Sequence, residues 1–274
     1  MGSIVVFIPF WGMVPVYGLA FLLYAWAFAK NDAGTYRWGR IVLVLAGFAH
    51  LFTLLNFGRV RGEWPPVSGG ESMVILANSI AFIYMYLEFR SRAHGLGIFA
   101  TFIILAFQVV GSIIGPALEV PEILRGVGFG PHVAFNITAF ASFTIAAATA
   151  LTYLLQYRQL RSLRPGPLLS RLPSLEQLDH MSHRSTLLGW VFLSMGLVLG
   201  AKLAEQVWGK AWQWDPKQCT TLLTWMIFGF TLFLRRFRAW QGGKMATVTI
   251  IGFLSIILAF VLFNGLMPSV HHFS

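Results

Sequence analysis

The sequence predicts an all-α, polytopic membrane protein in which eight transmembrane helices form a single integral membrane domain, residues 1–274. Hydrophobic residues make up 57% of the chain and charged residues only 11%, and the mean hydropathy is +0.69. A soluble domain carries about 25% charged residues. Several apolar runs also reach the roughly 20 residues that a helix needs to cross a bilayer. Continuous runs without alternation favour helices, which bond their backbone polar groups internally.

The apolar runs place the eight spans along the chain. The first run is followed by Lys30 and has no small-residue cleavage site after a short apolar core, so we interpret it as a retained span and not as a signal peptide. The longest connection, 158–184, is rich in proline and arginine, which is typical of a loop. The predicted spans are 4–29, 40–57, 72–90, 95–118, 131–157, 185–204, 218–234 and 246–268.

The basic residues predict the orientation of these spans. The net charge is +10, and 14 of the 20 Lys and Arg residues fall in alternate connections, which the positive-inside rule assigns to the cytoplasm. We therefore expect a protein of the bacterial cytoplasmic membrane with both termini and residues 205–217 outside. This pattern argues against a nucleic-acid surface. The 14 residues are Lys30, Arg37, Arg40, Arg90, Arg92, Arg158, Arg161, Arg164, Arg171, Arg184, Arg235, Arg236, Arg238 and Lys244.

Residues 205–217 form an unusual segment between two apolar runs, because three tryptophans and a carboxylate lie close together. Indole rings at a membrane surface could form the floor of a site for a flat apolar ligand, and the charges could steer its polar groups. The alternative is that the indoles belong to the aromatic belt of the membrane interface. The residues in question are Trp208, Trp212, Trp214, Asp215, Lys210 and Lys217.

Histidines are expected at the same depth as this Trp-rich segment. His132 follows Pro131 where the fifth span begins, and His271 and His272 follow the eighth span. A neutral imidazole is a good axial ligand for heme iron. His132 and His271 or His272 are therefore candidate ligands of a heme b that the indoles and Asp215 would contact. The alternative is that these histidines are ordinary polar residues at helix ends.

Three further ionisable residues lie in or beside the second and third spans. His50 lies inside the second span, where an ionisable residue is a functional candidate by default. It could be a second heme ligand, part of a proton path, or a hydrogen-bonding partner of a neighbouring helix. Glu71 and Glu88 bracket the third span, and we expect Glu88 at the cytoplasmic interface and Glu71 in an outer polar turn.

The Trp-rich segment resembles the WWD signature of the CcsA/CcmC (ResC-like) cytochrome c assembly family, whose approximate pattern is WGxxWxWDPKE followed by a further Trp. The resemblance covers nearly the whole chain and is most specific in the last quarter. The matching positions are Trp208 to Lys217, Trp225, Arg238 to Gly242, Gly252-Phe253, Pro268 to His271, His132 and, weakly, Pro65 to Glu71.

The resemblance implies a protein that holds heme on the outer membrane face with His132 and His271 as ligands and hands it to apocytochrome c. CcsA-type members act with a CcsB/ResB-like membrane partner, whereas CcmC-type members pass heme to a chaperone. If this chain catalyses a reaction, the resemblance implies a cytochrome c synthetase (heme lyase).

Two positions depart from the family pattern. Gln218 stands where the family has Glu, and Phe233 stands at or next to the position of a histidine that CcsA-type members use on the path of heme across the membrane. The phenyl ring of Phe233 has no lone pair with which to ligate iron, so the usual delivery route is in doubt, whereas external heme holding is not.

Two other functions are compatible with the residues. One is a membrane subunit of an electron-transfer complex that retains b-type heme as a redox centre, with His50 as a candidate ligand. The other is a heme-free scaffold, against which the external histidines argue. The single cysteine, Cys219, excludes an intrachain disulfide and means that the chain cannot supply both thiols for heme attachment.

Overall fold

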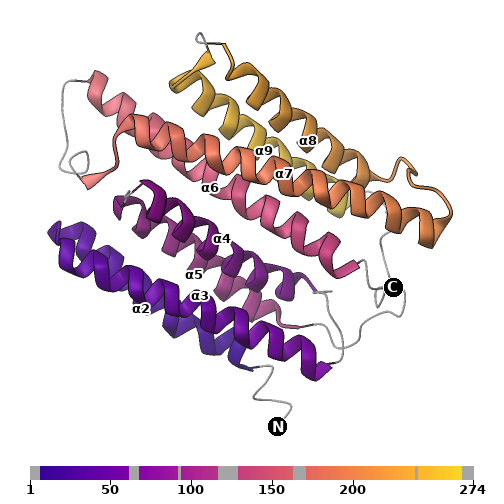
Figure 1. The fold of residues 1–274 in the computed structure, drawn as a ribbon, viewed down its shortest axis with the longest axis horizontal. Helices are drawn as coiled ribbons and strands as arrows, with labels where there is room; N and C mark the ends of the chain where they lie inside the picture. Colours follow the sequence, from indigo (N-terminus) through magenta and orange to yellow (C-terminus); the bar gives the residue numbers. More distant parts are fainter. Residues whose placement is uncertain are drawn as a thin grey trace.

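The computed structural model describes residues 7–61, 68–91, 94–116, 129–162, 171–237 and 240–266, without the side chains of 216 and 258–266. These residues are almost entirely helical and contain no strand, so the all-α class is confirmed for the part of the chain described (Figure 1). A π-helical turn, η1 (Ile8–Gly12), precedes the first long helix, and a short 3₁₀ helix, η2 (His94–Leu96), precedes α5. The long helices are α2 (Met13–Lys30), α3 (Ala33–Arg61), α4 (Gly69–Ser91), α5 (Gly97–Ile114), α6 (Phe129–Arg161), α7 (Leu175–Trp208), α8 (Pro216–Leu234) and α9 (Gly243–Leu266).

Each long helix overlaps one predicted span. Six helices are long and apolar enough to cross a membrane, so the chain is an integral membrane protein. These six are 8–30, 33–61, 69–91, 94–114, 129–161 and 175–208. The two remaining helices, α8 and α9, fall outside this set, and the count of eight spans therefore stays a prediction.

Several helices are longer than the apolar runs that predicted them. The run at 185–204 lies within α7, which has 34 residues, and the run at 40–57 lies within α3, which has 29. At about 1.5 Å per residue, α7 is roughly 50 Å long, against about 30 Å for the hydrocarbon core. The apolar run marks only the part of the helix suited to lipid. The polar turns beyond it continue the helix, and at the start of α7 a Ser174–Gln177 capping box bonds the free backbone N–H groups.

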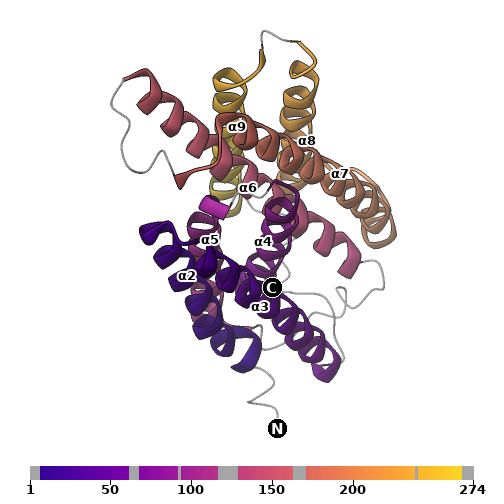
Figure 2. The ribbon, with the colours of Figure 1, turned by 60° about the vertical axis from the view of Figure 1, so that its left-hand side comes forward.

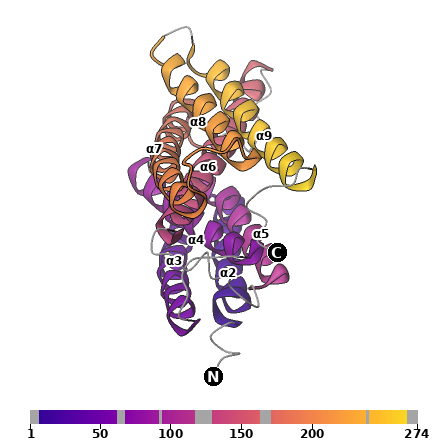
Figure 3. The same ribbon diagram turned by 90° about the vertical axis from the view of Figure 1, so that its right-hand side faces the viewer.

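The helices form two groups, α2–α5 and α6–α9, which lie side by side in all three ribbon views (Figures 1, 2 and 3). α6 holds them together, because it packs against α7 and α9 in its own group and against α4 in the other. One buried apolar cluster crosses this boundary, since Ile80 and Tyr84 of α4 belong to the same cluster as Ala141 and Ile145 of α6.

Aromatic stacking defines the centre of the second group. Phe143 of α6 and Phe228 of α8 are fully buried, and their rings stack with centroids 3.9 Å apart. Trp190 of α7 stacks on Trp225 of α8 at 5.2 Å and donates its indole N–H to the Trp225 carbonyl oxygen. α8 is thus fixed against both α6 and α7, which positions the connection that leads into it.

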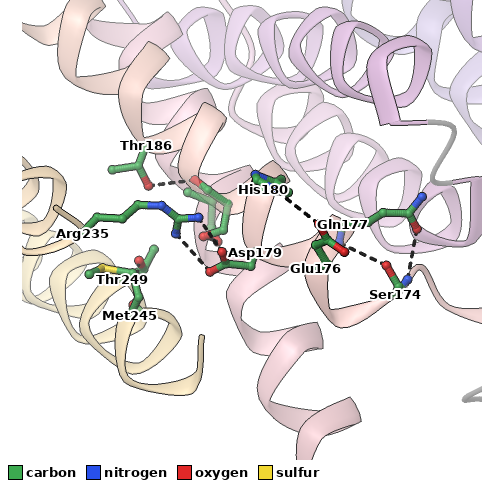
Figure 4. A network of polar contacts seen from close by, with 11 residues as sticks. Ser174, Glu176, Gln177, Asp179, His180, Thr186, Arg235, Met245 and Thr249 are labelled. Atoms are coloured by element: carbon green, nitrogen blue, oxygen red, sulfur yellow. Dashed lines mark hydrogen bonds and ion pairs between the residues drawn. The ribbon is translucent and has the colours of Figure 1, made fainter. Parts of the chain in front are cut away.

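Consecutive long helices run antiparallel, so alternate connections lie at the same end of the bundle (Figure 1). The two ends differ chemically because the residues in these connections differ. The Trp-bearing end contains the start of α6, the end of α7 and the start of α8. The basic end contains the opposite ends of these helices. There Arg235, just after α8, forms a two-pronged ion pair with Asp179 in the second turn of α7 (Figure 4).

Candidate functional site

His132 lies in the first turns of α6, at the Trp-bearing end of the second helix group. Its imidazole Nδ1 lies 2.8 Å from the carbonyl oxygen of Gly196 on α7. The two helices approach closely here because α7 presents glycines. A Cβ added to Gly200 would lie 2.6 Å from the Cε1 atom of His132, and one added to Gly196 would lie 2.7 Å from the Oδ1 atom of Asn136.

The contact with Gly196 determines which nitrogen of His132 carries the proton. A carbonyl oxygen can only accept, so Nδ1–H must donate, and in the neutral ring the free lone pair is then on Nε2. Metal-binding histidines are commonly oriented in this way by a backbone carbonyl. Nε2 is also the ring nitrogen farther from α7, because the added Cβ of Gly200 would lie 3.6 Å from Nε2 and 2.9 Å from Nδ1. In its neutral form the imidazole is therefore held in place and suited to bind iron through Nε2.

Asn136, one turn further along α6, supports the same ring. Its amide nitrogen donates to the backbone carbonyl of His132 at 2.9 Å and lies 3.3 Å from both ring nitrogens. An atom on the lone-pair axis of one ring nitrogen would be clearly farther from the other. The equal distances thus place the amide over the ring and leave the Nε2 lone-pair axis to another ligand.

The Trp-rich segment connects α7 to α8. Trp208 is the last residue of α7, and Gly209 ends that helix in the left-handed conformation at φ 73°. The indoles of Trp212 and Trp214 meet edge to face, with centroids 5.5 Å apart. Trp214 itself has φ +57°, a conformation that is costly for a bulky residue, and its side chain is 78% exposed. The connection therefore presents an indole to its surroundings at a cost in backbone strain, which is typical of functional sites.

Asp215 and Gln218 fix this connection from its C-terminal side. Asp215 is the N-cap of α8, where its buried carboxylate accepts from the backbone N–H of Lys217 at 2.9 Å. Gln218 accepts from the N–H of Gln213 at 2.9 Å and donates to the carbonyl of Ala211 at 3.4 Å. A glutamate at 218 could make the first bond and not the second. Gln218, which departs from the family pattern, therefore has a structural use here.

The structure brings His132 and the Trp-rich segment to the same end of the second helix group. Gly200, which faces the His132 ring, lies eight residues before Trp208 on α7, a rise of roughly 12 Å. His132 is thus deeper than the connection, and the two share the α7 surface between them. His271 and His272 lie outside the described residues. Within the described part, no group of three or more His, Cys, Asp or Glu side chains could hold a bare metal ion.

His50 lies in the other helix group. It is fully buried in α3, and its Nδ1 lies 3.0 Å from the hydroxyl of Tyr17 on α2. Asn78 of α4 donates to the Gly47 carbonyl at 2.9 Å and approaches the same hydroxyl at 3.4 Å. None of the hydrogen bonds found among the described residues links His50 to His132 or to the Trp-rich segment. Of the roles considered for His50, hydrogen bonding to a neighbouring helix is the one for which the described residues supply a partner.

The structure also shows the surroundings of three other residues that the sequence analysis singled out. The placement of Glu88 at the cytoplasmic interface stays a prediction; within the protein its side chain is fully buried and accepts from the Tyr24 hydroxyl at 2.8 Å. Glu71 is also buried, in the first turn of α4, and pairs with Arg61 at 2.6 Å. Phe233 is 57% exposed near the end of α8 and contacts two other phenylalanines.

Comparison with known proteins gives a consistent picture. A family model described as "Cytochrome C assembly protein" matches residues 67–271. The chain is 23% identical over 280 residues to cytochrome c biogenesis protein CcsA of Pyropia yezoensis, which covers 88% of each chain. It is 24% identical to the CcsA of Trieres chinensis, covering 94% of this chain and 95% of that one.

A solved structure has the same fold. The cytochrome c heme lyase CcmF superposes with a TM-score of 0.66 at 16% identity, and the match covers 98% of this chain. The chain spans about half (48%) of that protein's length.

Proposed function

The chain belongs to the cytochrome c assembly protein family, and from that premise we propose that it handles heme during cytochrome c maturation. Its role would be to hold heme at the outer membrane face for attachment to apocytochrome c. The name of the CcsA relatives, which align over nearly their whole length, supports this function directly. The site at the Trp-bearing end supports it independently.

The observation that carries the proposal is the orientation of His132. With Nδ1–H bound to Gly196, Nε2 of the neutral ring would be the atom that holds the iron of heme b. His271, the second proposed ligand, lies at the end of the matched region of the family model. His132 and His271 would together supply the protein's ligands to heme iron.

The indoles of the Trp-rich segment would contact the porphyrin face. Trp214 is the strongest candidate because its side chain is exposed, and Trp212 packs against it. Trp208 is the last residue of α7, so it lies at the same end of the bundle as Gly200 and His132. Asp215 acts here chiefly through α8, since its carboxylate caps that helix and thereby holds the connection in position.

The contribution of the chain to attachment would be positioning. In heme attachment, each thiol of the apocytochrome adds across a vinyl double bond, so that an S–C and a C–H bond form and nothing leaves. The chain cannot supply both thiols, because its sequence has one cysteine, Cys219. Holding the thiol beside the vinyl group lowers the activation free energy of this addition, and it needs no acid or base from the chain.

The membrane arrangement is part of the proposal. We infer eight spans, with α8 and α9 as the seventh and eighth, in the bacterial cytoplasmic membrane. Both termini and the Trp-bearing end would face outward, as the positive-inside rule predicts. A CcsB/ResB-like partner would complete the system. Phe233 lies where a heme-carrying histidine would be expected, so heme would reach the outer site without that ligand.

The comparisons do not favour the alternative of a redox subunit that retains its heme. The matched relatives are named for cytochrome c biogenesis. The hydrogen bond of His50 to Tyr17 also gives that residue a structural role.

Covalent heme in a reporter cytochrome tests the proposal. The chain would be co-expressed with a CcsB/ResB-like partner and a secreted apocytochrome that carries one CxxCH motif, in a host that lacks its own maturation system. We expect heme-stained reporter with the wild-type chain and a loss of at least tenfold with His132→Ala. Protein levels of both forms must match. Equal heme attachment in the two cases would refute the assigned site, and no attachment in any combination would refute the function.

A further inference from the structure

A cavity at the basic end of the bundle has no part in the heme site described above. It has a volume of about 480 Å³ and lies where the α2–α3 turn, η2 and the start of α7 meet. Figure 2 shows the chain entering α7 beside the ends of α2 and α5. The volume falls in the range of roughly 300–1,000 Å³ that is usual for small-ligand sites.

The lining of this cavity is strongly basic. Arg37 and Arg40 come from the first turns of α3, and Arg171 precedes α7. Among the described residues, none of the three guanidinium groups forms an ion pair with a carboxylate. Arg40 contacts the face of Phe89, which leaves its N–H donors available. Three guanidinium groups without an ion pair among the described residues line one cavity, and this favours an anionic ligand.

Two carboxylates beside residues that line the cavity, Glu88 and Asp32, have other hydrogen-bond partners. Glu88 lies beneath the cavity, fully buried, with the Tyr24 hydroxyl on one oxygen and Nδ1 of His94 at 3.0 Å from the other. Asp32 caps α3, where the Thr35 hydroxyl and the N–H groups of Gly34 and Thr35 hold the pKa of its carboxyl below the usual value. Among the described residues, neither carboxylate forms an ion pair with one of the three arginines.

The walls of the cavity are held in place by backbone contacts. The Arg171 carbonyl packs directly on Gly95, since an added Cβ there would lie 2.0 Å from that oxygen. Gln177, in the first turn of α7, donates to the Ser91 carbonyl at the end of α4 at 3.2 Å. Arg171 is thus fixed relative to the first helix group, and the separation of the basic walls does not depend on a ligand.

We propose that this cavity binds a phosphate-type oxyanion at the cytoplasmic membrane surface. Guanidinium groups bind phosphate oxygens in pairs, and basic pockets between helices on the cytoplasmic side are known to bind anionic lipid headgroups. The oxyanion is either the headgroup phosphate of an anionic phospholipid or free phosphate. The bound group would link the α2–α3 turn to the start of α7 and so connect the two helix groups.

Stabilisation of the purified full-length protein by added anions tests this proposal. The midpoint of thermal unfolding would be followed in a neutral detergent while dihexanoyl phosphatidylglycerol, dihexanoyl phosphatidylcholine or inorganic phosphate is added at constant ionic strength. A ligand of the folded state raises the midpoint with its concentration, which gives an apparent affinity. The variants are Arg37→Gln combined with Arg171→Gln, and Arg236→Gln as a matched control, because Arg236 is exposed at the same end and does not line the cavity.

We expect phosphatidylglycerol to raise the wild-type midpoint, and the double variant to need more than tenfold higher concentrations for the same rise. This follows from about a fivefold loss of affinity for each arginine removed. Arg236→Gln should behave as wild type. If inorganic phosphate gives the same rise, the free anion suffices; if only phosphatidylglycerol does, the lipid is the source. If the double variant does not fold, Arg37→Gln alone, whose side chain is exposed, gives the comparison. No rise with either anion, or equal losses in the control, would overturn the proposal.

Discussion

The Nδ1 atom of His132 and the carbonyl oxygen of Gly196 lie 2.8 Å apart, and this contact joins α6 to α7 at the Trp-bearing end. It orients the imidazole without using Nε2. It also depends on the absence of side chains on α7, because Gly196 and Gly200 leave room for Asn136 and the His132 ring. The position of His132, the proposed iron ligand, is therefore sensitive to substitution of Gly196 or Gly200.

Gly200→Ala should reduce the bound heme. The new methyl group would lie 2.6 Å from Cε1 of His132, so the ring must turn and the Gly196 bond must weaken. We expect at least a threefold loss of heme per protein in the absorption spectrum, and a destabilisation of about 1–3 kcal/mol from overpacking. The control is Gly18→Ala in α2, where no atom lies within 4 Å of the added Cβ. Similar heme content in the two variants would show that the close approach does not matter.

Asp215 can be tested as a helix cap or as a charge that contacts heme. Asparagine caps as well as aspartate does, whereas alanine costs about 1 kcal/mol. If capping is its role, Asp215→Asn should keep both thermal stability and heme content, and Asp215→Ala should lose stability. If Asp215→Asn instead loses heme as severely as Asp215→Ala, the carboxylate charge itself is needed at the site.

Gln218 should control the order of the Trp-rich segment. Gln218→Leu removes the acceptor for the Gln213 N–H, and one net hydrogen bond is worth about 1 kcal/mol. We therefore expect hydrogen exchange at the Gln213 amide to be about fivefold faster. Gln218→Glu keeps the acceptor and should exchange as wild type does. Equal exchange in the leucine variant and the wild type would show that this side chain does not restrain the segment.

Substitution of Trp214 by glycine should raise the stability of the protein and lower its heme content. Trp214→Gly removes the cost of a bulky residue at φ +57°, and relief of about 1 kcal/mol is expected. The variant also loses the exposed indole and should bind less heme. Thermal unfolding and heme content, measured on the same preparation, check both parts. A variant that loses stability and keeps its heme would contradict the assignment of Trp214 to the heme face.

The helices were predictable from the sequence, whereas their ends were not. Each apolar run fell within or across one long helix, because a lipid-facing segment must be both apolar and helical. The run at 185–204 missed the first ten residues of α7, since helices that leave the bilayer need not be apolar. Their polar turns are stabilised by caps and ion pairs such as that of Asp179 with Arg235.

The site was predictable in part. Asp215 followed by proline is a helix-start signal, and Gly196-x-x-x-Gly200 is a close-packing signal in membrane helices. Both were present in the sequence and could have indicated the cap and the α6–α7 contact. The left-handed conformation of Trp214 and the burial of Glu88 had no such signal. They arise from tertiary contacts that bring distant segments together.

The absorption spectrum of the purified protein tests the central claim most directly. We predict a b-type heme spectrum in the wild type, a loss of at least half the heme in His132→Ala and in His271→Ala, and an unchanged spectrum in His50→Ala. Imidazole added to the His132→Ala protein should restore the signal, because it supplies the missing ligand. A wild-type protein without heme, or a spectrum indifferent to both substitutions at the outer site, would contradict the account.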